Sequence, residues 1–340
     1  MRRLMAGLTL LTLSVVSMAQ QAGPYSVTKT AKVGGLGGYD YVYADQVGRR
    51  LYVPRTGTEG RVSVFDLDTL APVSELPNIS AMGAAVSTKS GHGFATSNPV
   101  AMWDAKTLAP IKTIQVEGKP DGILYDAFND HIYILGHTAP QATVINAADG
   151  AIVGTIDLGG AAEQAVTDGA GHVYVSIEDK DNIAIIDAKK LVVTGYYGLD
   201  GKGGGCAGLA MDVKNQILFA ACHKPQTMVM LSAKDGKIID ALPIGQGCDG
   251  AQFNPNTMEA FSSQSDGTLS IIKENSPTSF SVEQTVKTMA GAKTLTLDQK
   301  TNRVLVIAGE FGPAPEPEPG KRPARGELIP DSFRIMAVGK

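Results

Sequence analysis

Residues 168–187 of the chain read DGAGHVYVSIEDKDNIAIID. An acidic residue and a glycine-containing turn come first, and the apolar run Val173-Tyr174-Val175 follows them. A second apolar run, Ile183-Ala184-Ile185-Ile186-Asp187, ends the stretch. Runs rich in β-branched and aromatic residues, bounded by glycine and polar residues, are typical of β-strands. The stretch therefore predicts two consecutive β-strands.

The same pattern recurs in seven windows along the chain, at a spacing of 39 to 44 residues. The polar residue that ends the first strand of each window marks the period, at Asp45, Ser87, Asp126, Asp168, Asp212, Asn254 and Asp298. A period of about 40 residues with four strands in each unit is typical of β-propellers, in which one unit is one blade. The sequence therefore predicts an all-β fold, a seven-bladed β-propeller of four-stranded antiparallel blades.

The last window lacks a fourth strand, because the chain ends at Lys340 soon after the apolar residues 333–338. Residues 25–33 precede the first window and alternate as an outer strand does. We expect this N-terminal strand to pair with the last blade and to close the ring. The Pro-rich residues 312–330 are expected to form a loop within that blade, so that residues 20–340 make a single propeller domain.

The N-terminus has the three parts of a secretory signal peptide. Arg2 and Arg3 precede an apolar run over residues 4–16, and the small residues Ser17 and Ala19 follow it. This layout predicts a cleaved signal peptide at residues 1–19 and a periplasmic or secreted protein. No later stretch approaches the roughly 20 apolar residues of a membrane-spanning helix.

Composition and motifs argue against several functional classes. The formal net charge is −4 and aromatic residues make up 6% of the chain, so a nucleic-acid-binding face is not expected. The sequence lacks a G-x-S-x-G elbow, an H-E-x-x-H motif, a P-loop and a C-x-x-C-H haem motif. Residues 203–208 fit G-x-G-x-x-G but precede a strand instead of opening a helix, so they are interpreted as a loop.

Residues 25–340 resemble the YVTN-repeat (YncE-like) family of β-propellers. The motifs that carry this resemblance are Leu51-Tyr52-Val53, Val173-Tyr174-Val175, the Asp-x-x-Thr turns at residues 66–69 and 104–107, and Lys119-Pro120-Asp121-Gly122. Three further motifs look like those of exported bacterial members: Gly247-Cys248-Asp249-Gly250, Ser265-Asp266-Gly267-Thr268-Leu269 and Glu310-Phe311-Gly312-Pro313. The resemblance implies the fold and export, but it implies no reaction, because a fold does not fix a function.

Three cysteines in an exported chain suggest one disulfide and one remaining thiol. Aligned by repeat, Cys206 and Cys248 occupy the same position in adjacent windows, and we predict the bridge Cys206–Cys248. Counting across the turn before Cys222 places it on the opposite sheet face from Cys206, although a one-residue bulge would reverse this. A Cys206–Cys222 bridge and three reduced thiols remain alternatives.

Aligning the windows also places polar side chains at two positions that border one mouth of the channel. The leading position, at the start of the first strand, is occupied by Asp40, Met82, Asp121, Glu163, Ala207, Asp249 and Lys293. The trailing position, at the end of the second strand, is occupied by Thr56, Asn98, His137, Glu178, His223, Ser265 and Gly309.

From these positions we predict a ligand-binding site at the channel mouth, formed by His137, Glu178, His223, Asp121, Glu163 and Asp249. Imidazole and carboxylate groups are ligands of zinc and copper, so His137 and His223 are candidate ligands of a divalent metal ion. The alternative is a solvated rim whose side chains do not converge. His92, His131 and His172 align with turns on the opposite side and are not assigned to the site.

Two hypotheses of function follow. The first is an exported binding module or scaffold that binds a small ligand, a metal ion or a protein partner on the channel-mouth face, because loops carry the function of rigid frames. The second is a periplasmic enzyme, a hydrolase or an oxidoreductase, with a metal or cofactor in the channel mouth. No residue can be assigned as its nucleophile or general base. We expect a monomer.

Overall fold

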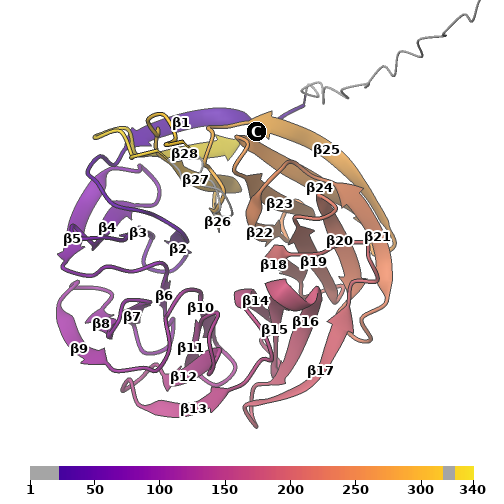
Figure 1. The fold of residues 1–340 in the computed structure, drawn as a ribbon, viewed down its shortest axis with the longest axis horizontal. Coiled ribbons are helices and arrows are strands. Elements are labelled where there is room, and N and C mark those ends of the chain that lie inside the picture. The colour runs from indigo at the N-terminus through magenta and orange to yellow at the C-terminus, as the bar shows by residue number, and fades with distance from the viewer. Residues whose placement is uncertain (1–22, 317–325) are drawn as a thin grey trace, which may run out of the picture.

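The computed structural model describes residues 23–316 and 326–340, which form a ring of seven β-sheets around a central axis (Figure 1). Each sheet has four antiparallel strands, so the predicted seven-bladed β-propeller is confirmed. The predicted signal peptide lies outside the described residues, as do residues 317–325 of the Pro-rich stretch. No helix with the length and hydropathy of a membrane span occurs in the described ranges.

Blades 1 to 6 each contain four strands that follow one another in the chain. In blades 1 to 3 these are β2 (Tyr43–Asp45), β3 (Arg50–Arg55), β4 (Arg61–Asp66), β5 (Pro72–Pro77), β6 (Ala84–Val86), β7 (His92–Ala95), β8 (Val100–Asp104), β9 (Pro110–Ile114), β10 (Ile123–Asp126), β11 (His131–Leu135), β12 (Ala142–Asn146) and β13 (Ile152–Ile156). In blades 4 to 6 they are β14 (Ala162–Thr167), β15 (His172–Ile177), β16 (Asn182–Asp187), β17 (Val192–Gly198), β18 (Cys206–Asp212), β19 (Ile217–Cys222), β20 (Thr227–Ser232), β21 (Ile238–Pro243), β22 (Cys248–Asn254), β23 (Glu259–Gln264), β24 (Thr268–Ser276) and β25 (Ser279–Lys287). A short 3₁₀ helix, η1 (Glu178–Lys180), follows β15.

Blade 7 combines the two ends of the chain. Its strands are β26 (Leu295–Asp298), β27 (Arg303–Ala308), β28 (Arg334–Gly339) and, outermost, β1 (Ser26–Lys32). The pairing of β1 with β28 runs from Ser26 opposite Gly339 to Lys32 opposite Arg334. Figure 1 shows β1 lying along the outer side of β28. The predicted closure by the N-terminal strand is therefore confirmed.

Side-chain contacts anchor both ends on blade 6 as well. Gln284 accepts a 2.9 Å hydrogen bond from the Tyr25 backbone N–H and donates a 2.8 Å bond to the Tyr25 carbonyl oxygen. The buried Glu259 carboxylate accepts a hydrogen bond from the Tyr25 hydroxyl and pairs with the Lys340 ammonium at 2.8 Å. These contacts attach the closing strand to the blade next to the one it completes.

The apolar core is divided among the blade interfaces. The described residues contain seven buried clusters, and each lies between two neighbouring blades, as when Tyr133 of blade 3 packs in one cluster with Val175 of blade 4. Middle strands such as β19 are buried along their length, because their sheet is covered on both faces, whereas the outer strands β5 and β9 are mostly exposed. Each blade therefore depends on both of its neighbours for burial.

Turns follow the predicted chemistry. In the turn after β4, the Asp66 carboxylate accepts hydrogen bonds from the backbone N–H of Thr69 at 2.7 Å and from its hydroxyl at 2.6 Å. Asp104 accepts the same pair of bonds from Thr107 in the turn after β8. Aspartate favours such turns because it bonds backbone groups two or three residues further on.

A buried carboxyl group lies at the interface of blades 5 and 6. Glu274 on β24 is 3% exposed and accepts a 2.7 Å hydrogen bond from the Asn215 side-chain amide. Burial raises the pKa of Glu274 from 4.5 to about 7, and the nearby Asp212 carboxylate adds to the rise. The folded protein therefore binds the Glu274 proton more tightly than the unfolded chain does.

Removing the closing strand is expected to destabilise the ring. A chain that lacks residues 20–33 exposes the edge of β28 and loses the contacts of Tyr25 with blade 6. We expect a melting temperature lower by on the order of 10 °C or more, or aggregation, in differential scanning calorimetry. A shortened chain that melts at the temperature of the full protein would contradict this role of β1.

The Glu274 proton is expected to make stability pH-dependent. Because the folded-state pKa is raised, the stabilisation is complete below about pH 4.5 and is lost as the pH rises through about 7. Glu274→Gln stays uncharged, so between pH 5 and pH 8 its free energy of unfolding should fall less than that of the wild type, by on the order of 1–3 kcal/mol. Urea denaturation at both pH values measures this, with the exposed Glu75→Gln as the matched control. Equal pH dependence of Glu274→Gln and wild type would refute it.

Candidate functional site

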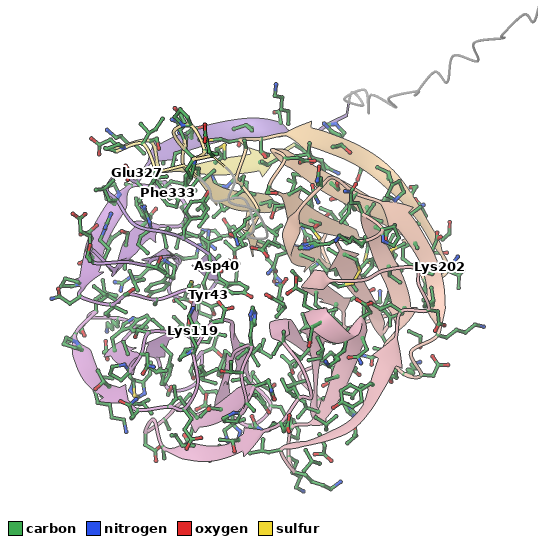
Figure 2. The ribbon with its side chains drawn as sticks, in the orientation of Figure 1. Asp40, Tyr43, Lys119, Lys202, Glu327 and Phe333 are labelled. Carbon is green, nitrogen blue, oxygen red and sulfur yellow. A yellow bond between two sulfur atoms is a disulfide. The ribbon has the colours of Figure 1, made fainter. Side chains whose placement is uncertain are left out.

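The first strands of the blades are the innermost ones, so the segments that lead into them meet around the channel axis (Figure 1). Asp40 lies near the centre of the ring, whereas Lys202 and Glu327 lie toward its periphery (Figure 2). The channel-mouth cluster, as we use the term, contains the side chains that meet there: Asp40, Tyr41, Asp121, His137, Glu163, Asp249 and Lys293. It draws on the leading positions of five blades.

A lysine joins two of the carboxylates across blades 6, 7 and 1. The Lys293 ammonium lies 3.0 Å from Asp40 Oδ1 and also contacts Asp249. All three side chains are only 21–22% exposed. Burial lowers the pKa of Lys293, but the two carboxylates outweigh it and hold the pKa above its usual value. Lys293 is therefore a fixed positive charge in the cluster.

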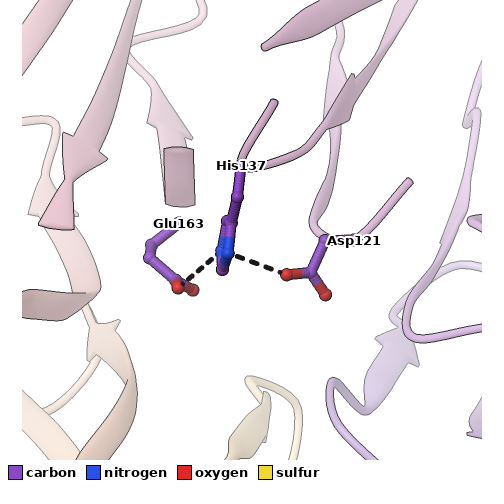
Figure 3. Close-up of side chains that lie close together, drawn as sticks. All are labelled: Asp121, His137 and Glu163. Carbon is purple, nitrogen blue, oxygen red and sulfur yellow. Dashed lines mark ion pairs between the residues drawn. The ribbon is translucent and has the colours of Figure 1, made fainter. Parts of the chain in front are cut away.

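A histidine joins two further carboxylates across blades 3 and 4. His137 Nε2 lies 2.9 Å from Glu163 Oε1 and 3.3 Å from Asp121 Oδ2 (Figure 3). One ligand atom from each of these residues lies within 4.8 Å of the other two. The Tyr41 hydroxyl donates a 3.1 Å hydrogen bond to Glu163 Oε2, whereas the buried Asp121 Oδ1 has no hydrogen-bond partner.

Burial, together with neighbouring carboxylates, favours the protonated forms of the acids in the cluster. Burial raises the pKa of Asp40 from 3.8 to about 7; Lys293 opposes this rise, and Asp249 and Asp121 add to it. Burial likewise raises the pKa of Asp121 and of Glu163, and the neighbouring Asp249 carboxylate contributes to both. The four carboxyl groups face two cationic groups, so the cluster is suited to hold further positive charge.

This environment favours the protonated form of His137. The hydrogen bond to Glu163 is the main cause that raises the pKa of His137 to about 9, while burial opposes it and the charges of Glu163 and Asp121 add to it. His137 is thus a cation at neutral pH. Its side chain is 47% exposed, so solvent reaches it from the mouth.

Two of the predicted site residues, Glu178 and His223, take no part in the ion pairs of this group. Glu178 begins η1, and its Oε1 is 4.0 Å from His223 Nδ1. The other ring nitrogen of His223 bonds to the backbone carbonyl of Cys248. The structure therefore brings together four of the six predicted residues (Asp121, His137, Glu163 and Asp249) and places Glu178 and His223 in a separate pair. His223 does not share a three-residue ligand group with His137 among the described residues.

Three members of the channel-mouth cluster were not selected from the sequence. Asp40 and Lys293 occupy the leading position in the repeat alignment, and the available signal was their opposite charges in the first and last windows, which a closed ring makes neighbours. Tyr41 stands next to Asp40 but outside the aligned position. Its role depends on the reach of the phenol to Glu163, a residue 122 positions away in the chain.

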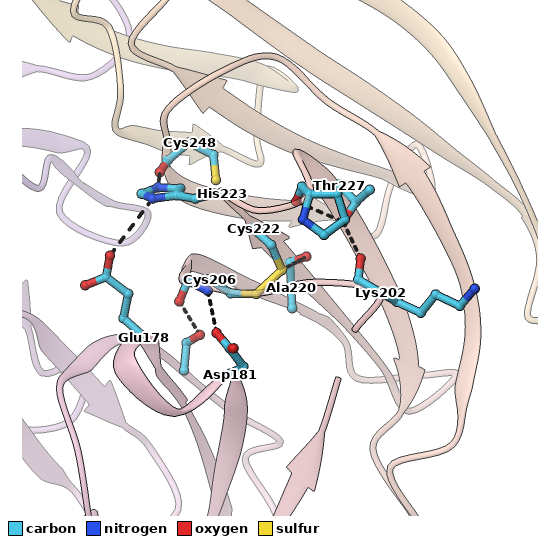
Figure 4. The surroundings of a disulfide bond; sticks show 12 residues. Glu178, Asp181, Lys202, Cys206, Ala220, Cys222, His223, Thr227 and Cys248 are labelled. Carbon is cyan, nitrogen blue, oxygen red and sulfur yellow. Dashed lines mark hydrogen bonds and ion pairs between the residues drawn. A yellow bond between two sulfur atoms is a disulfide. The ribbon is translucent and has the colours of Figure 1, made fainter. Parts of the chain in front are cut away.

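The predicted disulfide is wrong. Cys206 and Cys222 form the bridge, and Cys248 is a buried free thiol (Figure 4). The cause is a register shift between Cys206 and Gly208, which places Cys206 directly opposite Cys222 on adjacent strands of blade 5. A bulge of this kind reverses the facing of residues beyond it, which regular alternation does not predict.

Comparison with known proteins supports the fold. No family model matches the sequence, and no curated protein does. Among solved structures, the chain matches the RRP9 WD40 repeats with a TM-score of 0.71 at 9% identity, covering 94% of this chain and 99% of that chain. It matches U3-55K with a TM-score of 0.71 at 9% identity, covering 92% and 99% of the two chains.

A chain of the mitotic checkpoint complex gives a TM-score of 0.70 at 10% identity, covering 90% of this chain and 95% of that one. The protein has the β-propeller fold of these structures. At such low identity, the likeness extends to the fold alone.

The assigned disulfide predicts a measurable loss of stability. It closes a loop with a sequence separation of 16 residues, for which chain entropy gives about 3 kcal/mol. Cys206→Ala combined with Cys222→Ala should lower the free energy of unfolding by about that amount in urea denaturation, and reducing agent should destabilise the wild type but not the double variant. Cys248→Ala, as the control, should keep its sensitivity to reducing agent. Non-reducing peptide mapping that finds Cys248 in a bridge would overturn the assignment.

Proposed function

We propose that the protein is an exported binding module of the YVTN-repeat (YncE-like) type, whose channel mouth binds a small cationic ligand. The family is supported by the repeat motifs, such as Val173-Tyr174-Val175 and residues 247–250. Export to the periplasm or the medium is supported by the signal-peptide pattern of residues 1–19. Residues 20–340 act as one propeller domain in this proposal.

The observation that carries the proposal is the charge imbalance of the channel-mouth cluster. Four carboxyl groups converge there, while Lys293 and His137 supply two positive charges. Burial and mutual repulsion raise the pKa values of Asp40, Asp121 and Glu163. A bound cation would stabilise the ionised carboxylates and so gain binding energy from groups that are unfavourable without it.

The cluster already shows how it accommodates a compact cation. Asp40 and Asp249 hold the Lys293 ammonium between them. Asp121 Oδ1, which has no hydrogen-bond partner, offers a further acceptor oxygen at the channel mouth. Because the leading positions belong to different blades of a rigid frame, these oxygens are held in place before a ligand arrives.

The contacts of His137 favour binding over nucleophilic catalysis. In the described residues its ion-pair partners are the carboxylates of Glu163 and Asp121. A histidine that activates a nucleophile contacts a hydroxyl or thiol instead. The binding module is therefore preferred to the enzyme hypothesis.

The proposal predicts that cations stabilise the folded protein. Putrescine, Mg²⁺, Zn²⁺ and Cu²⁺ are tested by thermal shift, with the dianion glutarate as the negative control. We expect at least one cation to raise the melting temperature by several degrees, because a ligand that binds only the native state stabilises it against unfolding. Asp121→Asn combined with Glu163→Gln should remove the response, whereas Asp331→Asn, which changes an exposed carboxylate outside the mouth, should keep it.

Two outcomes would refute a cationic ligand. One is that no cation shifts the melting temperature more than glutarate does. The other is that the double variant responds as strongly as the wild type and the Asp331→Asn control.

A further inference from the structure

We propose that Asp121, His137 and Glu163 form a binding site for one divalent transition-metal ion, zinc or copper. The inference rests on the proposed cation-binding function and names the ligand class. It also changes the residues involved, because His223 is replaced by two carboxylates as the partners of His137.

The donor atoms are already close to the spacing that a metal ion imposes. In a tetrahedral zinc site with bonds of about 2.0–2.1 Å, neighbouring ligand atoms lie about 3.3 Å apart. His137 Nε2 lies 3.3 Å from Asp121 Oδ2 and 2.9 Å from Glu163 Oε1. Figure 3 shows the imidazole between the two carboxylates. All three ligand atoms lie within 4.8 Å of one another, so rotation of the two carboxylate side chains would bring them to coordination distances.

The chemistry of the donors selects the class of metal. One imidazole nitrogen with carboxylate oxygens suits zinc and copper, whereas magnesium and calcium prefer oxygen ligands alone. The imidazole binds a metal ion as the neutral base, so the ion displaces the proton between His137 Nε2 and Glu163, and this proton is released to the solvent. Three protein ligands leave a further coordination position open. Solvent can reach that position, because the His137 side chain beside it is 47% exposed. A water molecule or a group of a partner can fill that position.

A second, independent feature is the unsatisfied oxygen of Asp121. Asp121 Oδ1 is buried and has no hydrogen-bond partner. A buried acceptor without a partner is destabilising, because it has lost its water and gained nothing in exchange. A cation bound by this carboxylate would compensate it, and a carboxylate can present either oxygen to a metal ion.

Neighbouring groups fix the ligands in position. The Tyr41 hydroxyl bonds Glu163 Oε2 at 3.1 Å, which leaves Oε1 directed at His137. Such outer partners orient metal ligands in proteins. On the other side, the Asp121 backbone N–H donates to the Leu135 carbonyl at 2.8 Å, which ties the leading segment of blade 3 to the strand that precedes His137.

Glycine at position 136 permits this approach. A Cβ atom there would lie 2.6 Å from the Lys119 carbonyl oxygen, so any larger residue would push apart the two segments that carry His137 and Asp121. The local backbone is therefore built for close contact of these two side chains.

Isothermal titration calorimetry with ZnCl₂ and with CuCl₂ tests the site in the full-length mature protein after removal of metal by chelation. We expect one ion per chain for the wild type. His137→Ala and, separately, the isosteric Glu163→Gln should each weaken binding by more than the roughly 10- to 100-fold that follows loss of an outer partner. Tyr41→Phe should weaken it within that range.

The control variants are His172→Ala and His223→Ala. His172 also pairs with a carboxylate, Asp168, at 2.8 Å, but it lies at the opposite end of its strand from the mouth. Both variants should bind metal like the wild type. Circular dichroism and melting temperature verify that each variant is folded. If His137→Ala does not fold, the isosteric Glu163→Gln still tests the site.

Three outcomes would overturn the metal site. The first is that the wild type binds neither Zn²⁺ nor Cu²⁺. The second is that folded His137→Ala and Glu163→Gln bind as tightly as the wild type, and the third is that binding is lost in His223→Ala alone. Stabilisation of the wild type by putrescine without metal binding would remove the metal site and leave the cationic-ligand function standing. No response to any cation would remove both.

Discussion

The structure depends on burial between neighbouring blades. Each apolar cluster lies at an interface, so a blade cannot bury its residues alone, and the ring must be complete before every interface is covered. Closure comes from the pairing of β1 with β28, which puts strands from both ends of the chain into one sheet. The side-chain contacts of Tyr25 and Lys340 with Glu259 extend that join into blade 6.

This closed frame allows the channel mouth to hold an unfavourable set of charges. Four carboxyl groups and two cationic groups meet at the axis because each lies next to the first or second strand of a blade, and packing further out fixes the position of these strands. Isolated loops would move apart to relieve the repulsion among Asp40, Asp121 and Asp249. The packing energy of the blades therefore supports an arrangement of charges that isolated loops would not keep.

The sequence predicted the fold well, because a repeat supplies the same signal seven times. The strand pattern of Val173-Tyr174-Val175 and its counterparts predicted the four-stranded blade. The lack of a fourth strand in the last window predicted that the N-terminal strand closes the ring. The repeat alignment also predicted which positions reach the mouth, since equivalent residues of a symmetric ring face the same axis. Asp121, His137, Glu163 and Asp249 followed from it.

Local departures from the repeat were beyond that reasoning. The bulge between Cys206 and Gly208 decides the disulfide, and a bulge leaves no clear mark in the sequence. His223 stands two blades away from His137 and bonds to the Cys248 carbonyl, a contact that the repeat alignment does not predict. Tyr41 belongs to the cluster because its long side chain reaches Glu163. An alignment of sequence positions does not show how far a side chain reaches.

The pairing of Ser26 with Gly339 brings the first and last strands of the propeller together at a seam in blade 7. The two residues face each other across neighbouring strands, so a short linker can join them and new ends can be opened in an exposed turn of another blade. The leading segments at the axis keep their order around the ring in any such rearrangement. The protein thus offers a circular template in which the channel mouth and the location of the chain ends can be engineered independently.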